Sequence, residues 1–480
     1  MTYNNFRTET DSDGIALITW DMPDRSMNVF TVEVMDELDA IIDAVVADAA
    51  VKGAVITSGK ESFSGGADLT MFKALQQQYL DEVAKDPQTA MKMLFDGIGR
   101  MTGLFRKLET CGKPFVSAIN GTCMGGAFEM SLACHGRVAA DGDKVTMGLP
   151  EVKVGLFPGA GGTQRVMRLT DPQAGLEMLT SGKSLSPAKA KQMNLIHQVA
   201  APDQLIETAK KMIRDGLKPV APWDEKGFKL PGGPVYSAAG ANLWPPAIAI
   251  LRRETAGNYP AAAAILKCAY EGLLVQFDTG LRIEQRYFTE IVRTTEAAAM
   301  IRSLFVSLQE LNKGARRPAD VPATKFRKIA VLGAGFMGAG IAYVTAKAGI
   351  PVVLLDRDVA SAEKGKAHSD NLISDAIKKG RARPEEKEKL LGLITPTADY
   401  ADIEGADLVI EAVFEDAEVK KGATGKAEAV LKPAAIFASN TSTIPITSLA
   451  QNSKRPKNFI GIHFFSPVDR MMLVEIIMGK

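Results

Sequence analysis

The fold of the first part of the chain is decided by residues 120–162, which read NGTCMGGAFEMSLACHGRVAADGDKVTMGLPEVKVGLFPGAGG. The apolar run at 115–119, just before this stretch, predicts a buried strand, and the Asn-Gly pair that follows predicts a turn. Two glycines, Gly125 and Gly126, then precede an apolar segment that predicts a helix over 127–134. Strands that alternate with helices in this way are typical of a layered α/β fold.

Two acids stand where helices are predicted to begin. Glu129 lies in the first turn of one helix, and Glu151 follows Pro150, a residue suited to the first position of another. Two carboxylates that converge on one site suit acid/base chemistry at a carbon–carbon double bond. The N–H of Gly126 can approach a substrate oxygen closely because glycine has no side chain. A simpler interpretation stays open here, in which both acids only complement helix dipoles.

This part of the chain resembles the crotonase family, the enoyl-CoA hydratases and isomerases. The likeness rests on GGAFE at 125–129, GLPE at 148–151, PGAGGTQR at 158–165 and FSGGAD at 63–68. It implies a core built as a spiral of ββα turns. It also implies that the N–H groups of Ala67 and Gly126 hold the thioester oxygen, while Glu129 and Glu151 handle the water and the alpha proton. The turn at 141–143 is slightly longer than is usual in the family.

Composition excludes several classes of function. The 480 residues are 46% hydrophobic and 24% charged, as in a globular protein of two or three domains. The formal net charge of +1, with Lys and Arg spread along the chain, gives no reason to expect a nucleic-acid partner. No apolar run reaches the roughly 18 residues of a transmembrane segment. The four cysteines lack CxxC spacing, and the four histidines form no metal motif, so we expect reduced thiols in the cytoplasm and no metal.

The rest of the first half alternates between strand and helix patterns before it loses them. Strands are predicted at 15–20 and 53–57, helices at 31–47, in parts of 69–107 and across 163–216, a surface excursion at 219–246, and helices again at 247–312. The excursion is rich in Pro, Gly and Ala, which is typical of a linker. We therefore expect the last helical stretch to connect two catalytic units.

A new domain begins after the charged, proline-bearing segment at 316–325. An apolar strand at 328–332 runs into the GxGxxG motif at 333–338, and a second strand, 351–355, ends in Asp356. This order is the dinucleotide-binding fingerprint of a Rossmann-type domain, in which the glycines admit the pyrophosphate and the acid reaches the ribose hydroxyls. An acid at this position favours NAD over NADP, and the neighbouring Arg357 weakens that preference.

A lone histidine is most often structural, but His463 stands between an apolar strand and a proline turn, and Glu475 follows on a strand predicted at 473–477. A histidine oriented by a carboxylate is a general base suited to oxidising an alcohol. This half resembles the 3-hydroxyacyl-CoA dehydrogenases. The resemblance implies that His463 is the base, Glu475 its orienting partner and Ser442 the hydroxyl that contacts substrate and cofactor. The NAD-site positions that it implies are Gly333, Gly335, Met337, Gly338, Asp356, Glu415, Lys420, Ser442 and Ser466.

The order of these parts predicts three regions: a hydratase/isomerase domain at 1–216, an excursion and helical linker at 217–324, and an NAD-binding domain at 325–480. It resembles the alpha chains of bacterial complexes for fatty-acid beta-oxidation. The resemblance implies hydration of trans-2-enoyl-CoA and NAD-dependent oxidation of the 3-hydroxyacyl-CoA product, with coenzyme A as part of the substrate. A thiolase beta subunit and a second copy of the chain stay open as partners.

Two alternatives stay open for the function: a different crotonase reaction, such as isomerisation only, or a silent scaffold subunit for a thiolase. The intact acids and oxyanion positions argue against silence. In the resembling dehydrogenases a helical domain follows the strand at 473–477, and it supplies an Asn beside the catalytic His. We therefore expect the chain to be truncated relative to that family. We expect it to hydrate crotonyl-CoA and to form little NADH from 3-hydroxybutyryl-CoA.

Overall fold

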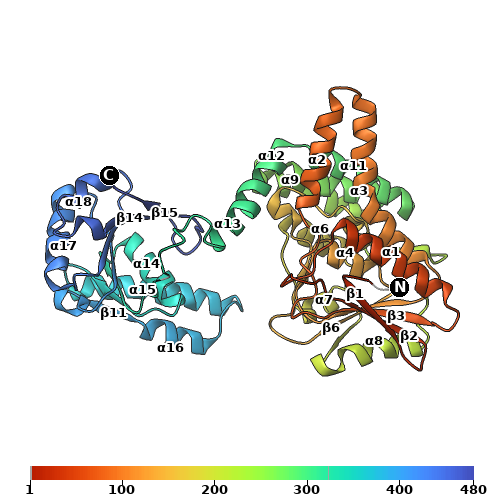
Figure 1. Cartoon of the computed structure of the whole chain (residues 1–480), viewed down its shortest axis with the longest axis horizontal. Helices are drawn as coiled ribbons and strands as arrows, with labels where there is room; N and C mark the ends of the chain where they lie inside the picture. The colour runs from red at the N-terminus through yellow and green to blue at the C-terminus, as the bar shows by residue number, and fades with distance from the viewer. Residues whose placement is uncertain (1–2, 323) are drawn as a thin grey trace. The chain divides into compact units, whose positions relative to one another are not determined.

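The structure is a computed structural model that describes residues 3–322 and 324–480. The chain forms two compact units, Met1–Arg317 and Pro318–Lys480 (Figure 1). This division falls inside the stretch predicted as excursion and linker, at 217–324, and the division of the sequence into three regions stays a prediction. None of the described helices is both long enough and apolar enough to cross a membrane.

The first unit is organised by a six-stranded sheet with the order β1-β2-β3-β4-β6-β8. Its strands are β1 (Phe6–Thr10), β2 (Ile15–Trp20), β3 (Gly53–Ser58), β4 (Phe115–Ile119), β6 (Gly136–Ala140) and β8 (Gln198–Ala200). Only the β1–β2 pair is antiparallel. Every residue of β3, β4 and β6 is buried, as expected for parallel strands that are covered on both faces. The predicted strands at 15–20, 53–57 and 115–119 are confirmed.

A second, smaller layer places the two predicted acids together. Two short strands, β5 (Cys123–Met124) and β7 (Met147–Gly148), pair in parallel. Helix α4 (Gly126–Ala133) begins just after β5, and the 3-10 helix η1 (Glu151–Val154) follows β7. Because parallel neighbours end at the same edge, the segments that follow them start side by side. Alternation between the main sheet and this small one is the spiral of ββα turns that the resemblance implies.

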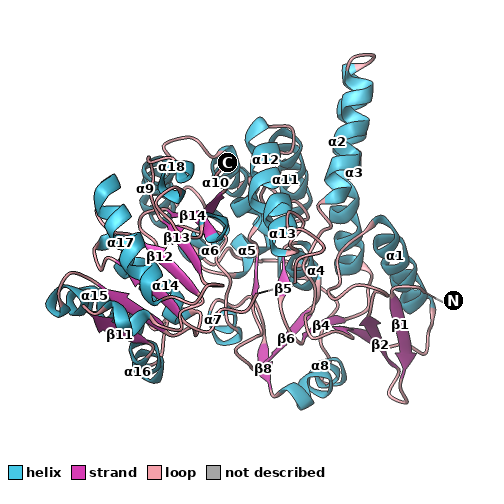
Figure 2. Cartoon of the chain, turned by 60° about the vertical axis from the view of Figure 1, so that its left-hand side comes forward, coloured by secondary structure: helices cyan, strands magenta, loops and turns pink. Residues whose placement is uncertain are grey.

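Helices cover the sheets of the first unit. They are α1 (Val32–Ala47), α2 (Thr70–Val83), α3 (Pro87–Thr110), α5 (Gly162–Leu169), α6 (Pro172–Ser181), α7 (Pro187–Gln192) and α8 (Leu205–Arg214). Helix α8 packs on β3, β4 and β6 (Figure 2), whereas α2 and α3 form a hairpin (Figure 1). Local signals fix the helix starts: the Thr31 side chain accepts a hydrogen bond from the N–H of Val34, and Asp86 caps α3 ahead of Pro87.

The helices after residue 237 are part of the first unit. They are α9 (Ala238–Thr255), α10 (Pro260–Gly272), α11 (Phe277–Ile291), α12 (Thr295–Met300), the π-helix η4 (Ile301–Ser307) and α13 (Leu308–Asn312). The prediction of a surface excursion up to residue 246 is wrong in its last part, because α9 contains Pro245 and Pro246. Trp244 is buried and its ring lies 5.2 Å from that of Tyr270, so tertiary packing overrides the proline signal.

The second unit has a seven-stranded sheet with the order β11-β10-β9-β12-β13-β14-β15. Its strands are β9 (Ile329–Leu332), β10 (Val352–Leu355), β11 (Ile394–Thr397), β12 (Leu408–Glu411), β13 (Ile436–Ser439), β14 (Phe459–Phe464) and β15 (Val474–Ile477). Only β15 is antiparallel to its neighbour. Its helices are α14 (Phe336–Lys347), α15 (Val359–Lys378), α16 (Pro384–Gly392), α17 (Ala417–Val430) and α18 (Ile446–Ala450).

Alternate residues of β9 enter two different cores. Ile329 and Val331 pack in one core with residues of α14, and Ala330 and Leu332 pack in the other with residues of α17. The sheet is therefore covered by helices on both faces, which is the doubly wound Rossmann-type arrangement predicted for this part of the chain.

Candidate active sites

The first unit contains an apolar cavity of about 310 Å³ at the ends of β5 and β7. Its two carboxylates are Glu129 and Glu151. Apolar side chains from several elements form much of the wall, among them Met71, Leu75, Met101, Phe157, Phe288 and Phe305. An apolar wall with few polar groups is the usual form of a site that binds an apolar substrate.

Glu129 is held in place by the backbone of a loop. It lies on α4 with only 3% of its surface exposed. Its Oε1 atom accepts hydrogen bonds from the N–H groups of Ala160 and Gly162, both at 2.8 Å. Burial raises the pKa of Glu129 to about 7, although these N–H groups and the positive charge of Arg165 oppose the rise. A carboxyl group with a pKa near neutrality is suited to proton transfer.

Glu151 has a buried oxygen with no partner. Its Oε2 atom accepts no hydrogen bond from the described residues. Burial and the negative charge of Glu129 raise the pKa of Glu151 well above its usual value. The local structure differs from the predicted helix: Pro150 is the cap of a four-residue 3-10 helix, which ends at Gly155 with φ +78°. An unpartnered carboxylate oxygen at a cavity is a place for a reacting water or proton.

Two backbone N–H groups meet beside the acids. Ala67 and Gly126 both line the cavity, and a Cβ built on Gly126 would lie 3.6 Å from the Ala67 nitrogen. Within residues 3–322 and 324–480 neither N–H has an acceptor. Gly66 has φ +90°, and a Cβ there would lie 2.6 Å from the Met124 carbonyl oxygen, so only glycine allows this close approach. Two such N–H groups form an oxyanion hole.

A third buried acid, Glu284, was not predicted from the sequence. It lies on α11 and is fully buried. Its carboxylate accepts hydrogen bonds from the N–H of Gly161 and from the N–H of Thr163, the latter at 2.9 Å, and also from the Thr163 hydroxyl. Burial and the charge of Glu129 raise the pKa of Glu284 to about 8. No motif surrounds this residue, so only the tertiary contact reveals it.

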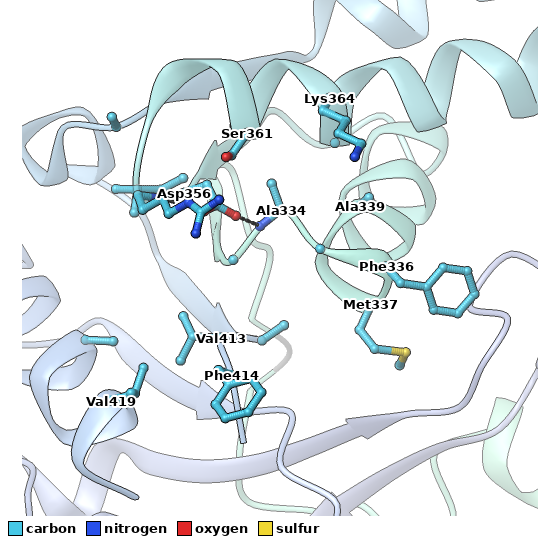
Figure 3. A pocket seen from close by; sticks show the side chains of 18 of the residues that line it. Ala334, Phe336, Met337, Ala339, Asp356, Ser361, Lys364, Val413, Phe414 and Val419 are labelled. Carbon is cyan, nitrogen blue, oxygen red and sulfur yellow. Dashed lines mark hydrogen bonds between the residues drawn. The ribbon is translucent and has the colours of Figure 1, made fainter. Parts of the chain in front are cut away.

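The second unit contains a cavity of about 1410 Å³ at the carboxyl ends of β9, β10 and β12 (Figure 3). The glycines of the motif form one wall. Gly333 has φ +94°, and a Cβ on Gly338 would lie 1.7 Å from the Gly333 carbonyl oxygen, so both positions require glycine. A Cβ on Gly335 would meet no protein atom within 4 Å, although this residue lines the cavity. The open space beside Gly335 fits a pyrophosphate at the start of α14.

Asp356 directly follows β10 and lines this cavity. Its Oδ2 atom accepts a hydrogen bond from the N–H of Ala334 at 2.6 Å, which is the dashed line in Figure 3. Its Oδ1 atom accepts one from the N–H of Arg357 at 2.7 Å. The carboxylate therefore holds the glycine loop and lies where the fingerprint places the ribose hydroxyls, so the residues present fit NAD.

A smaller cavity of about 320 Å³ shares Met337 with the larger one. It is lined by His463, Ser442 and Ser466. The Nδ1 atom of His463 lies 2.7 Å from Oε2 of Glu475. His463 lies within β14, not after it as predicted, and it pairs with Glu475 in the register of the β14–β15 ladder. A base and its orienting carboxylate thus stand at one end of the sheet.

An ion-pair cluster of Lys420, Glu411 and Glu415 lies at this cavity, which Lys420 and Glu415 line. The Lys420 ammonium, 2% exposed, lies 2.8 Å from Glu411 and 3.0 Å from Glu415. Glu415 also accepts hydrogen bonds from the Thr441 hydroxyl and from the N–H of Ser442. Although burial opposes the change, the bonds from Thr441 and Lys420 lower the pKa of Glu415 to about 2. The cluster therefore fixes the loop that carries Ser442.

The predicted residues gather around three cavities. Ala67, Gly126, Glu129 and Glu151 line the first; Gly333, Gly335, Met337 and Asp356 line the second; Glu415, Lys420, Ser442, His463 and Ser466 line the third. Gly338 and Glu475 lie behind these walls and contact residues that form them. Sequence reasoning missed Glu411, and it also missed Asn440, which accepts a hydrogen bond from the N–H of Phe464 at 2.8 Å.

Comparison with known proteins identifies both units. Residues 10–220 match the enoyl-CoA hydratase/isomerase family, and residues 328–480 match the NAD-binding domain of 3-hydroxyacyl-CoA dehydrogenase. The fatty acid oxidation complex subunit alpha of Shewanella amazonensis is 37% identical over 477 residues, which cover 98% of this chain and 65% of that protein. The subunit of the same name from Shewanella halifaxensis is 38% identical over 480 residues, covering 99% and 65%.

Among solved structures, the (S)-3-hydroxybutyryl-CoA dehydrogenase of Ralstonia eutropha is 38% identical, covers 32% of this chain and 55% of that chain, and has a TM-score of 0.32. The chain spans about 65% of the length of the curated relatives it matches. The two matched segments coincide with the parts of the chain that carry the acid pair and the glycine motif. The chain therefore joins a domain of the enoyl-CoA hydratase/isomerase family, at residues 10–220, to the NAD-binding domain of the 3-hydroxyacyl-CoA dehydrogenase family, at residues 328–480.

Proposed function

We propose that the first unit adds water to trans-2-enoyl-CoA thioesters and gives 3-hydroxyacyl-CoA. The observation that carries this proposal is the acid pair, Glu129 and Glu151, in an apolar cavity beside the unpartnered N–H groups of Ala67 and Gly126. An oxyanion hole without an acid pair would polarise a thioester but would not hydrate it. An acid pair alone would lack a group to stabilise the enolate.

The geometry accounts for each atom of the addition. The oxygen of water bonds to C3, and the electrons of the C2–C3 double bond move toward the thioester oxygen. That oxygen takes negative charge between the N–H groups of Ala67 and Gly126, where each donor is worth roughly 100- to 1,000-fold in rate. One of the two acids removes a proton from the water and the other delivers one to C2. Glu129 is buried, and Glu151 is partly buried with its Oε2 atom shielded from solvent, so bulk water has limited access to the two carboxylates.

Loss of the enoyl absorbance of crotonyl-CoA, measured in the ultraviolet, tests this proposal. We expect the purified chain to consume crotonyl-CoA and to form a product heavier by one water, as measured by mass spectrometry. The same acids could instead move a proton between C2 and C4, so 3-enoyl-CoA should be supplied in parallel. Conversion of 3-enoyl-CoA to 2-enoyl-CoA without hydration of crotonyl-CoA would show an isomerase and refute the hydratase.

For the second unit we infer binding of NAD and a base for oxidation of 3-hydroxyacyl-CoA. NAD, when bound, supplies the hydride acceptor for C3. The chain's own residues bind the cofactor along Gly333 and Gly335 and present His463 for the hydroxyl proton. Glu475 orients His463, and Ser442 and the neighbouring loop are held by Glu415. The carrying observation is that the glycine cavity and the histidine cavity share Met337.

The choice of NAD over NADP depends on Asp356. Its carboxylate would hydrogen-bond the ribose hydroxyls and repel a 2′-phosphate. Calorimetry should therefore show tighter binding of NAD(H) than of NADP(H). In Asp356→Ser the ratio of the Kd for NADP(H) to the Kd for NAD(H) should be smaller by roughly tenfold or more. Asp358→Ser is the matched control, because Asp358 caps α15 and serine can also cap a helix. Equal affinities in the parent protein would refute the role of Asp356.

We further propose acyl-CoA thioesters as substrates and a thiolase beta subunit as partner. The name of the relatives, subunit alpha of a fatty acid oxidation complex, supports a partner subunit, and the choice of a thiolase rests on the resemblance of the sequence. A homo-oligomer and a place in the bacterial cytoplasm remain predictions from the sequence. Co-expression with a thiolase subunit from the same genome, followed by size-exclusion chromatography, should give a joint peak. Separate elution of the two chains would refute the partnership.

A further inference from the structure

The loop that holds the catalytic Glu129 is bound by two carboxylates in alternation. The N–H groups of Ala160 and Gly162 donate to Oε1 of Glu129. The N–H groups between and after them, from Gly161 and Thr163, donate to Glu284. Each of the four successive N–H groups is therefore assigned to one acid or the other. The orientation of the peptides that reach Glu129 depends on the orientation of those that reach Glu284.

Glu284 reaches this loop from a distant part of the chain. It lies on α11, after the segment at 10–220 that matches the hydratase family. It is fully buried and does not line the cavity. The hydroxyl of Thr163 also donates to it, so three donors converge on its two oxygens. Such a group does not touch substrate, and any effect on the reaction must pass through the loop.

We propose that Glu284 is a positioning residue for the hydration reaction, which fixes residues 160–163 and thereby the carboxylate of Glu129. This inference rests on the proposed hydratase function. A glutamine at position 284 would keep one oxygen acceptor but would turn an amide NH₂ toward an N–H donor. One of the two backbone donors, that of Gly161 or that of Thr163, would lose its acceptor, and the loop would have to rotate. Misplacement of a reacting group by about 1 Å can cost roughly 100-fold in rate.

The acids also interact through their charges. The negative charges of Glu129 and Glu284 both raise the pKa of Glu151, after burial. The charged and titratable groups that face Glu284 are Glu129 on α4, Glu151 on η1, Arg165 and Arg168 on α5, and Cys268 on α10. Because the pKa of Glu284 is raised to about 8, its negative charge acts on Glu151 mainly above that pH, where Glu284→Gln lowers the pKa of Glu151. In a plot of kcat against pH, the transition caused by the titration of Glu151 should move to lower pH, whether this acid takes a proton from water or delivers one to C2.

The test compares Glu284→Gln with Glu290→Gln, an exposed glutamate on the same helix. We expect Glu284→Gln to lower kcat for crotonyl-CoA hydration roughly 10- to 100-fold, with KM within about twofold because the residue does not line the cavity. Its pH profile should shift as described above. The Glu290→Gln variant should keep the kcat and the pH profile of the parent protein.

A second variant covers the case in which Glu284→Gln does not fold. Thr163→Val removes the hydroxyl that donates to Glu284 and keeps both backbone N–H groups. We expect a several-fold lower kcat from it and a smaller pH shift. If the parent protein is active and Glu284→Gln has the same kcat and pH profile as Glu290→Gln, this inference alone is overturned. The same holds if Glu284→Gln is insoluble and Thr163→Val has the kcat of the parent protein. A parent without hydratase activity would overturn the proposed function as well.

Discussion

His463 and Glu475 face each other as a registered pair of the β14–β15 ladder, with 2.7 Å between Nδ1 and Oε2. A carboxylate only accepts hydrogen bonds, so Nδ1 must carry the proton. The opposite ring atom, Nε2, is then an acceptor at the cavity that His463 lines. The strand register itself, rather than a flexible loop, sets the ring in the state that a general base requires.

The first prediction concerns this ring. Nitrogen NMR of the chain labelled in its four histidines should show the neutral His463 ring as the Nδ1–H tautomer. Glu475→Gln should produce a mixture of tautomers, because the amide can both donate and accept. His368→Gln identifies a signal outside the pair and should leave that of His463 unchanged. A His463 signal in the Nε2–H form in the parent protein would contradict the assigned geometry.

The second prediction concerns the acid pair. Glu129→Gln and Glu151→Gln should each fold and should lower kcat for crotonyl-CoA hydration by roughly 100- to 10,000-fold, since each removes a proton-transfer group. Glu177→Gln is the control, because Glu177 pairs with Lys183 at an exposed position. The double variant should be scarcely slower than the slower single variant, because the two groups act in one step. Near-parental turnover in both single variants would refute the assignment.

The third prediction concerns stability against pH. The pKa of Glu151 is raised by burial and by the charge of Glu129. A raised folded-state pKa stabilises the fold below the unfolded pKa, near 4.5, and this contribution is lost as pH rises through the folded value. Glu151→Gln should therefore raise Tm at pH 8 by roughly a few degrees and change it little at pH 5. For the control Glu290→Gln, the difference in Tm from the parent protein should be the same at pH 5 and at pH 8. A Glu151→Gln variant that raised Tm at pH 5 and not at pH 8 would contradict the argument.

The fourth prediction concerns the glycine loop. A Cβ on Gly335 meets no protein atom within 4 Å, so Gly335→Ala should keep the melting temperature of the parent. The methyl group would enter the space for the pyrophosphate, and NAD affinity measured by calorimetry should fall roughly tenfold or more. Gly392→Ala, at another open position outside the cavity, should bind NAD normally. Unchanged affinity in Gly335→Ala would place the pyrophosphate elsewhere.

Much of the two sites could be predicted because their residues are close in sequence. The glycine motif follows β9 directly, and Glu129 stands one turn into a helix that two glycines open. In both places glycines are visible in the sequence, because the backbone there has a positive φ or passes close to other atoms, and only glycine allows this. A strand that is buried on both faces, such as β4, is also recognisable in the sequence, because four of its five residues are apolar.

The remainder depends on contacts that no local pattern encodes. Glu284 stands on an amphipathic helix with no motif around it, and only the fold brings it to the loop at 160–163. The prediction of helix across 163–216 is wrong at strand β8, which has one exposed and two partly buried residues and is defined by its pairing with β6. Helix α9 continues through two prolines because Trp244 anchors it. In each case long-range packing outweighs the local preference.

The wall of the cavity that contains Glu129 limits how this part of the chain could be moved into another protein. Phe288 from α11 and Phe305 from the π-helix line the same cavity as Glu129, yet both stand after residue 220. A gene rearrangement that carried only residues 10–220 into another chain would leave part of the cavity wall behind. The smallest segment that could be transplanted with its cavity intact therefore extends from β1 to residue 307, across the place where sequence families would draw the border.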